Sequence, residues 1–67
     1  MIVIQNFPTV AALQGWLHNA RMRQGRRDFA EWLSRYLRER DFVVNDRQYR
    51  FRDCINLLNG EDGYNVG

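Results

Sequence analysis

An apolar stripe between residues 28 and 37 constrains the fold of this chain more than any other feature. Its members recur at i, i+3, i+4, i+7 and i+8, the spacing of one face of a helix. A 67-residue chain with one cysteine has no disulfide and no multi-cysteine metal site to hold it together. The stripe must therefore be buried against other elements, and we interpret its aromatic residues as core. The stripe consists of Phe29, Trp32, Leu33, Tyr36 and Leu37.

A strand and a first helix are expected ahead of this stripe. Ile2–Ile4 is a β-branched run, which is typical of a short strand. Thr9 is a suitable N-cap for a helix over Val10–Ala20, whose apolar residues share one face. We expect a break between the two helices over Met22–Arg27, because this segment contains Gly25.

The segment after the second helix has two interpretations. In the first, Phe42–Val44 is a strand, Asn45–Asp46 a turn and Arg47–Arg52 a return strand, with Tyr49 and Phe51 pointing inward. Strict alternation of polar and aromatic residues over the return strand favours this hairpin. In the second, a helix capped by Asn45 runs through residues 45–59.

The hairpin interpretation leaves room for a short C-terminal helix. Asp53 is expected to cap this helix, which runs through Leu58 and ends at Asn59–Gly60. The expected fold is α+β: a small winged-helix-like domain with a short N-terminal strand, two helices, a β-hairpin wing and a short C-terminal helix. We expect one compact domain over residues 1–60 and a flexible acidic tail over residues 61–67.

The charge pattern is as uneven as the apolar one. All ten basic residues are arginines and lie between Arg21 and Arg52, together with five acidic residues. Residues 1–20 carry no charged side chain, and residues 53–67 carry only acidic ones. A GC-rich genome would explain arginine in place of lysine, but not its confinement. A concentrated arginine surface is typical of a partner rich in phosphates or carboxylates.

Catalytic and metal-binding patterns are missing from the sequence. His18, Ser34 and Cys54 are single and scattered, and there is no glycine-rich phosphate loop. We therefore predict a protein that is not an enzyme and uses no cofactor or metal. The longest apolar run, Met1–Ile4, is too short for a signal peptide or a membrane span, so we expect a cytoplasmic protein with no membrane partner.

Three segments resemble the phage excisionases, also called recombination directionality factors. They are Leu13-Gln14-Gly15-Trp16, Trp32-Leu33, and the wing Asn45-Asp46-Arg47-Gln48-Tyr49-Arg50-Phe51, which has Asp46 where the family favours glycine. The resemblance implies a non-catalytic DNA-bending protein that directs an integrase toward excision.

Two functional hypotheses follow. The first is a regulatory protein of phage or mobile-element type that binds double-stranded DNA. In a winged-helix domain the second helix enters the major groove and the wing contacts the adjacent backbone. The second hypothesis is a homodimeric interaction module that binds and inhibits an acidic host protein through its arginine and aromatic surface. The candidate DNA-binding residues are Arg26, Arg27 and Arg35 on the second helix and Arg47, Arg50 and Arg52 on the wing.

Overall fold

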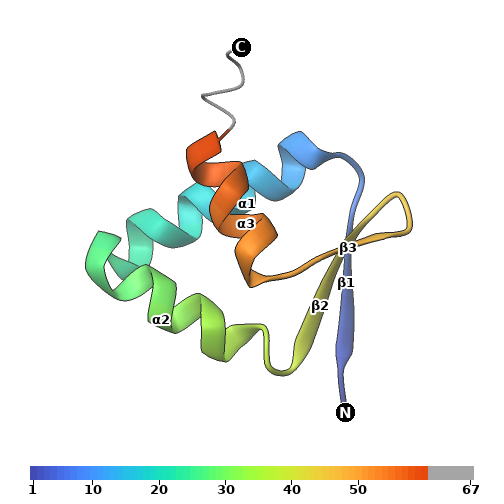
Figure 1. Cartoon of the computed structure of the whole chain (residues 1–67), viewed down its shortest axis with the longest axis horizontal. Coiled ribbons are helices and arrows are strands. Elements are labelled where there is room, and N and C mark those ends of the chain that lie inside the picture. The colour runs from blue at the N-terminus through green and yellow to red at the C-terminus, as the bar shows by residue number, and fades with distance from the viewer. Residues whose placement is uncertain (61–67) are drawn as a thin grey trace.

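The computed structural model describes residues 1–60, which form an α+β arrangement, as the sequence predicts (Figure 1). The acidic tail expected at residues 61–67 lies outside the described residues. The order of elements is also the expected one. The elements are β1 (Val3–Phe7), α1 (Val10–Gln24), α2 (Arg26–Tyr36), β2 (Arg40–Val44), β3 (Arg47–Tyr49) and α3 (Phe51–Gly60).

The two long helices meet at a single residue, Gly25. Thr9 caps α1 as predicted, because its Oγ1 accepts a hydrogen bond from the Ala12 amide at 3.0 Å. The break is shorter than the expected residues 22–27, since α1 continues to the residue before Gly25 and α2 begins directly after it. Gly25 has a φ of +91°, which strains any residue that carries a Cβ. Glycine therefore allows one residue to reverse the chain between the helices.

The sheet has β2 at its centre. β1 runs parallel to β2, with Val3 opposite Arg40 and Phe7 opposite Val44, and β3 runs antiparallel along the other edge of β2. α1 and α2 together form the crossover that a parallel pair of strands requires. β1 extends beyond the predicted Ile2–Ile4 because pairing with β2 continues as far as Phe7.

The hairpin turns at Asn45 and Asp46, as the sequence predicts. Both residues have positive φ, +52° and +66°, which is the type I′ geometry that matches the twist of two antiparallel strands. The return strand is shorter than the predicted Arg47–Arg52, since β3 ends at Tyr49. The hairpin interpretation is therefore correct up to this residue and wrong beyond it.

The residues after Tyr49 form α3 instead. Phe51 begins this helix and is 37% exposed, so the expectation that it points inward from a strand is wrong. Asp53 lies in the first turn rather than at the N-cap, and its Oδ2 accepts a hydrogen bond from the Arg50 amide at 3.0 Å. This contact is half of a capping box, which moves the start of the helix toward the hairpin. Cys54 and Leu58 then face the core.

The three helices cover one face of the sheet, and within residues 1–60 no element covers the other (Figure 1). The interpretation of the apolar stripe as core is confirmed: Phe29 and Leu33 are buried, and Trp32, Tyr36 and Leu37 are half-buried against them. The buried core residues are Leu13, Leu17, Ala20, Phe29, Leu33, Phe42, Val44, Tyr49, Cys54 and Leu58.

Aromatic rings pack around Phe42, which is fully buried in β2. Its ring centroid lies 5.4 Å from that of Phe7, 5.1 Å from that of Trp16 and 6.0 Å from that of Tyr36. Trp32 stacks on Tyr36 at 4.9 Å and extends the cluster along α2. These contacts join β1, β2, α1 and α2, because each of the four elements contributes at least one ring.

Within residues 1–60, no helix combines the length and the apolar character that crossing a lipid bilayer requires.

We expect Phe42→Ala to remove most of the stability of the fold. Replacing a fully buried phenylalanine by alanine costs about 3–5 kcal/mol, which is comparable with the whole stability of so small a domain. Urea denaturation followed by circular dichroism measures this loss. Val43→Ala is the matched control, because Val43 is adjacent but only half-buried. An equal loss in both variants would contradict the central role of the Phe42 ring.

Candidate nucleic-acid interface

The ten arginines fall into three groups by the elements that carry them, in a molecule whose longest dimension is 38 Å. Figure 1 places the corner between α1 and α2 at one end of this dimension and the hairpin turn at the other. The corner group consists of Arg21, Arg23, Arg26 and Arg27, the middle group of Arg35, Arg38 and Arg40, and the hairpin group of Arg47, Arg50 and Arg52.

The corner group draws its side chains from two helices. Because Gly25 alone separates them, the last turn of α1 and the first turn of α2 lie next to each other. Arg23, Arg26 and Arg27 are exposed. Arg21 is half-buried, and its Nη2 lies 3.2 Å from Nδ1 of His18. Within residues 1–60 none of the four guanidinium groups forms an ion pair, so their charge is available to a partner.

The first turn of α2 adds backbone donors to this corner. Gly25 is the N-cap and has no side chain to accept the first amides of the helix. Arg26 and Arg27 place two positive charges at the positive end of the helix dipole, an arrangement that costs a few tenths of a kcal/mol per residue. Asp28 offsets part of this charge. A bound anion would relieve the rest and would accept from the free amides.

The middle group is largely occupied within the protein. Arg35 donates from Nη2 to Oε2 of Glu31 at 2.9 Å in an exposed i,i+4 pair. The guanidinium carbon of Arg40 lies 4.3 Å from the centroid of the Tyr36 ring. Arg38 is exposed at the end of α2. Arg35, which the sequence placed in the interface, therefore already has a carboxylate partner.

The hairpin group is placed differently from the prediction. Only Arg47 lies on the return strand, where its guanidinium carbon sits 4.9 Å from the centroid of the Tyr49 ring. Arg50 occupies the junction between β3 and α3, and Arg52 lies in the first turn of α3. The expectation that Arg50 and Arg52 project from the wing is wrong, because the capping contact of Asp53 starts a helix there.

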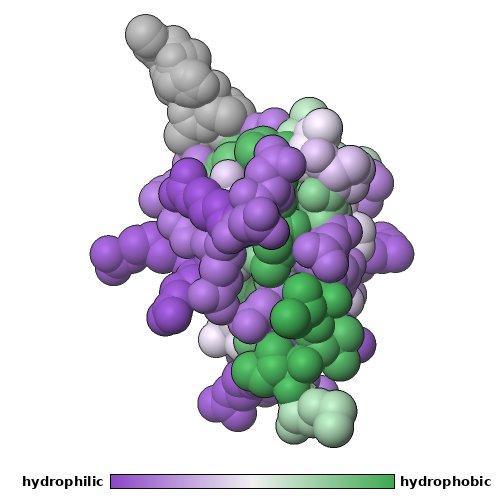
Figure 2. Space-filling model, turned by 90° about the vertical axis from the view of Figure 1, so that its right-hand side faces the viewer, coloured by the Kyte–Doolittle hydropathy of each residue, from purple (hydrophilic) through white to green (hydrophobic). Residues whose placement is uncertain are grey.

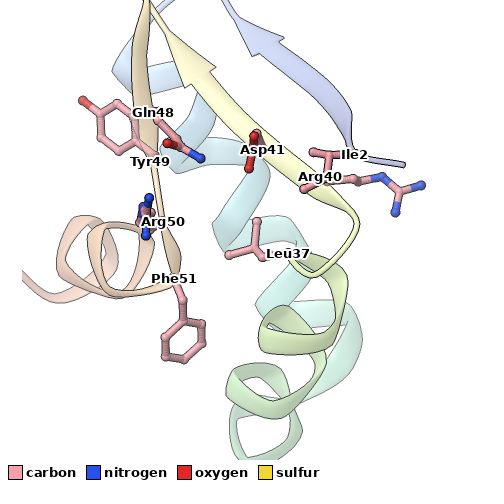
Figure 3. A pocket seen from close by; sticks show the side chains of 8 residues that line it. All are labelled: Ile2, Leu37, Arg40, Asp41, Gln48, Tyr49, Arg50 and Phe51. Carbon is pink, nitrogen blue, oxygen red and sulfur yellow. The ribbon is translucent and has the colours of Figure 1, made fainter.

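An open groove of about 390 Å³ separates the start of β2 from the start of α3 (Figure 3). Arg40 extends away from the groove, whereas Asp41 stands on the β2 wall of the groove. An acidic side chain in this position opposes phosphate binding. The lining residues are Ile2, Leu37, Arg40, Asp41, Gln48, Tyr49, Arg50 and Phe51.

The structure therefore brings together only some of the six arginines that the sequence selected. Arg26 joins Arg27 at the corner, Arg50 and Arg52 lie at the start of α3, and Arg35 stands apart from both. The prediction did not include Arg21 and Arg23, because it ended the first helix too early. Their position four and two residues before Gly25 is the signal that would have added them.

Within residues 1–60, His18, Ser34 and Cys54 lie on three different helices. Cys54 is fully buried, and burial, assisted by the nearby charge of Asp53, raises the pKa of its thiol to about 12. Within residues 1–60 no three histidine, cysteine or acidic side chains are grouped so that they would hold a metal ion.

No protein-family model, curated protein or solved structure matches this chain.

We expect Cys54 to resist thiol reagents while the protein is folded. The pKa of the folded thiol is raised to about 12 from 9.0, so the reactive thiolate is scarce at pH 8 and the sulfur is shielded. Reaction with a disulfide reagent should therefore be slow in buffer and fast in denaturant. Equal labelling rates in buffer and in denaturant would show that the thiol is accessible.

The raised pKa of the Cys54 thiol also lowers the free energy of unfolding as the pH rises from about 9 toward about 12, because in this range only the unfolded chain ionises at this thiol.

Proposed function

We propose that this protein is a small, non-enzymatic DNA-binding regulator that holds the phosphate backbone with the α1–α2 corner. One observation carries the proposal: Arg21, Arg23, Arg26 and Arg27 come from two helices to one corner and have no acidic partner within residues 1–60. Unpaired guanidinium groups beside open helix amides suit phosphate oxygens, which accept from both kinds of donor.

In its more specific form, the proposal is that the protein is a winged-helix, excisionase-like DNA-binding protein. In that form the first turn of α2 enters the major groove, as the leading residues of a recognition helix do. Arg47 on the hairpin, with Arg50 and Arg52 at the start of α3, makes a second contact with the backbone.

A second candidate function is supported by a different feature of the same corner. An open groove of about 240 Å³ lies between the corner and α3, with Arg21 and Arg26 among its lining residues. Phe29, Ile55 and Leu58 provide apolar walls. Basic residues around an apolar groove suit an amphipathic acidic segment of a host protein. Such a partner would be retained by the protein after nuclease treatment, whereas a partner bridged by nucleic acid would be lost.

We expect Arg26→Ala combined with Arg27→Ala to weaken DNA binding roughly tenfold at about 50 mM salt, because two phosphate contacts are lost. The dependence of log affinity on log salt should become shallower by about two units. Fluorescence anisotropy on a labelled random-sequence duplex, at about 50 and about 200 mM salt, measures both quantities.

Arg35→Ala is the matched control for this experiment. It removes one positive charge from α2, from a guanidinium that is already bound to Glu31, and we expect less than about a twofold effect. The pair Arg50→Ala and Arg52→Ala tests the second contact and should give an intermediate loss. If the unaltered protein does not bind the duplex at low salt, DNA is not the partner of the corner.

A further inference from the structure

The strand β1 has an unpaired edge. Val3 donates its amide to the Glu39 carbonyl at 2.8 Å, on the β2 side of the strand. Because successive residues of a strand direct their backbone groups to opposite sides, Ile4 and Asn6 direct theirs away from β2. β1 is the outermost strand of the sheet, so within residues 1–60 these amides and carbonyls have no strand to pair with.

This edge lacks the features that normally prevent pairing with another chain. Soluble proteins protect edge strands with charged residues, prolines or bulges. β1 contains no charged residue and no proline, and it pairs with β2 in an uninterrupted register. The first protective residue is Pro8, directly after the strand.

The side chains at the start of β1 are apolar and exposed on both faces of the sheet. Ile2, Val3 and Ile4 are 52%, 52% and 61% exposed, and they continue a patch that starts at Met1. On the face that Figure 2 shows, apolar side chains gather at the lower end of the molecule, and polar side chains lie over much of the rest of this face. An exposed apolar patch beside open backbone groups is typical of an interface.

We propose that this edge pairs antiparallel with the β1 edge of a second copy of the chain, which joins the two sheets into one. Two copies that each carry a formal charge of +2 repel each other over most approaches. Residues 1–20 are the only long stretch without charged side chains, so β1 offers a neutral contact. A two-fold axis makes the pairing antiparallel, which also places the two amino termini at opposite ends of the interface.

The corner proposed to bind phosphate stays free in this arrangement. Figure 1 shows β1 on the opposite side of the molecule from the α1–α2 corner. A dimer through β1 would therefore present two basic corners, the arrangement with which dimeric regulators contact two half-sites. The dimer itself does not depend on DNA binding, since the contact is formed by uncharged backbone and apolar side chains.

Sedimentation equilibrium of the full chain, over a range of concentrations, tests the proposal. We expect the unaltered protein to reach twice the mass of one chain. Ile4→Lys adds a charge at an exposed edge position, and Asn6→Pro removes an amide from the free edge while leaving the bonds to β2 in place. Both variants should remain at the mass of one chain. Met22→Lys is the matched control: it adds the same charge at an 82% exposed apolar residue of α1 and should still dimerise.

Amide hydrogen exchange locates the contact. The Ile4 and Asn6 amides should exchange more slowly as the concentration of unaltered protein rises, and this dependence should be absent in Ile4→Lys. Because the Ile4 side chain lies outside the core, this variant keeps its fold even if Asn6→Pro does not. Each of three results would overturn the proposal. They are a single-chain mass at every concentration, a dimer that still forms in Ile4→Lys, and amide exchange at Ile4 and Asn6 that is independent of concentration.

Discussion

The packing of aromatic rings around Phe42 is the interaction on which the rest of the structure depends. Phe42 lies in the central strand and contacts rings from β1, α1 and α2, so one buried side chain joins the sheet to both long helices. A chain of 67 residues buries little surface in total, and large aromatic side chains supply more apolar area per residue than aliphatic ones. The fold can therefore be stable without a disulfide or a metal.

Gly25 determines where the arginines of the two long helices lie on the surface. A one-residue reversal keeps the end of α1 and the start of α2 adjacent, and the arginines on either side of it come together as a consequence. The buried faces of the two helices are apolar, so Arg23, Arg26 and Arg27 are exposed, while Arg21 is half-buried beside His18. Their mutual repulsion is offset only in part by Asp28. This unbalanced corner is the physical basis of the proposed interaction with phosphates.

The protein separates two kinds of surface. The corner carries a group of arginines beside a small apolar groove, whereas the edge of β1 carries apolar side chains without charge. The proposed phosphate partner binds the first surface and gains nothing from the second. The proposed dimer places a second copy of the chain against the second surface, away from the first. The two proposed interactions therefore use different parts of the molecule and do not compete.

The local features of this fold were determined by the sequence alone. Three predicted features depend on residues within a few positions of one another, and all three are present in the structure. They are the stripe from Phe29 to Leu37, the Thr9 cap and the turn at Asn45 and Asp46. The sequence indicates a helical break around Gly25 but not its length, because helix propensity does not determine the residue at which the next helix begins.

The features that set the candidate surfaces were decided by tertiary structure. Residues 48–52 satisfy both a strand and a helix pattern, and the choice was made by the capping contact of Asp53 together with burial of Cys54 and Leu58 against α1. The parallel pairing of β1 with β2 joins segments more than thirty residues apart, and no local pattern encodes it. The grouping of the arginines, and the open edge of β1, follow from these long-range contacts, because each side chain is placed by the element that carries it.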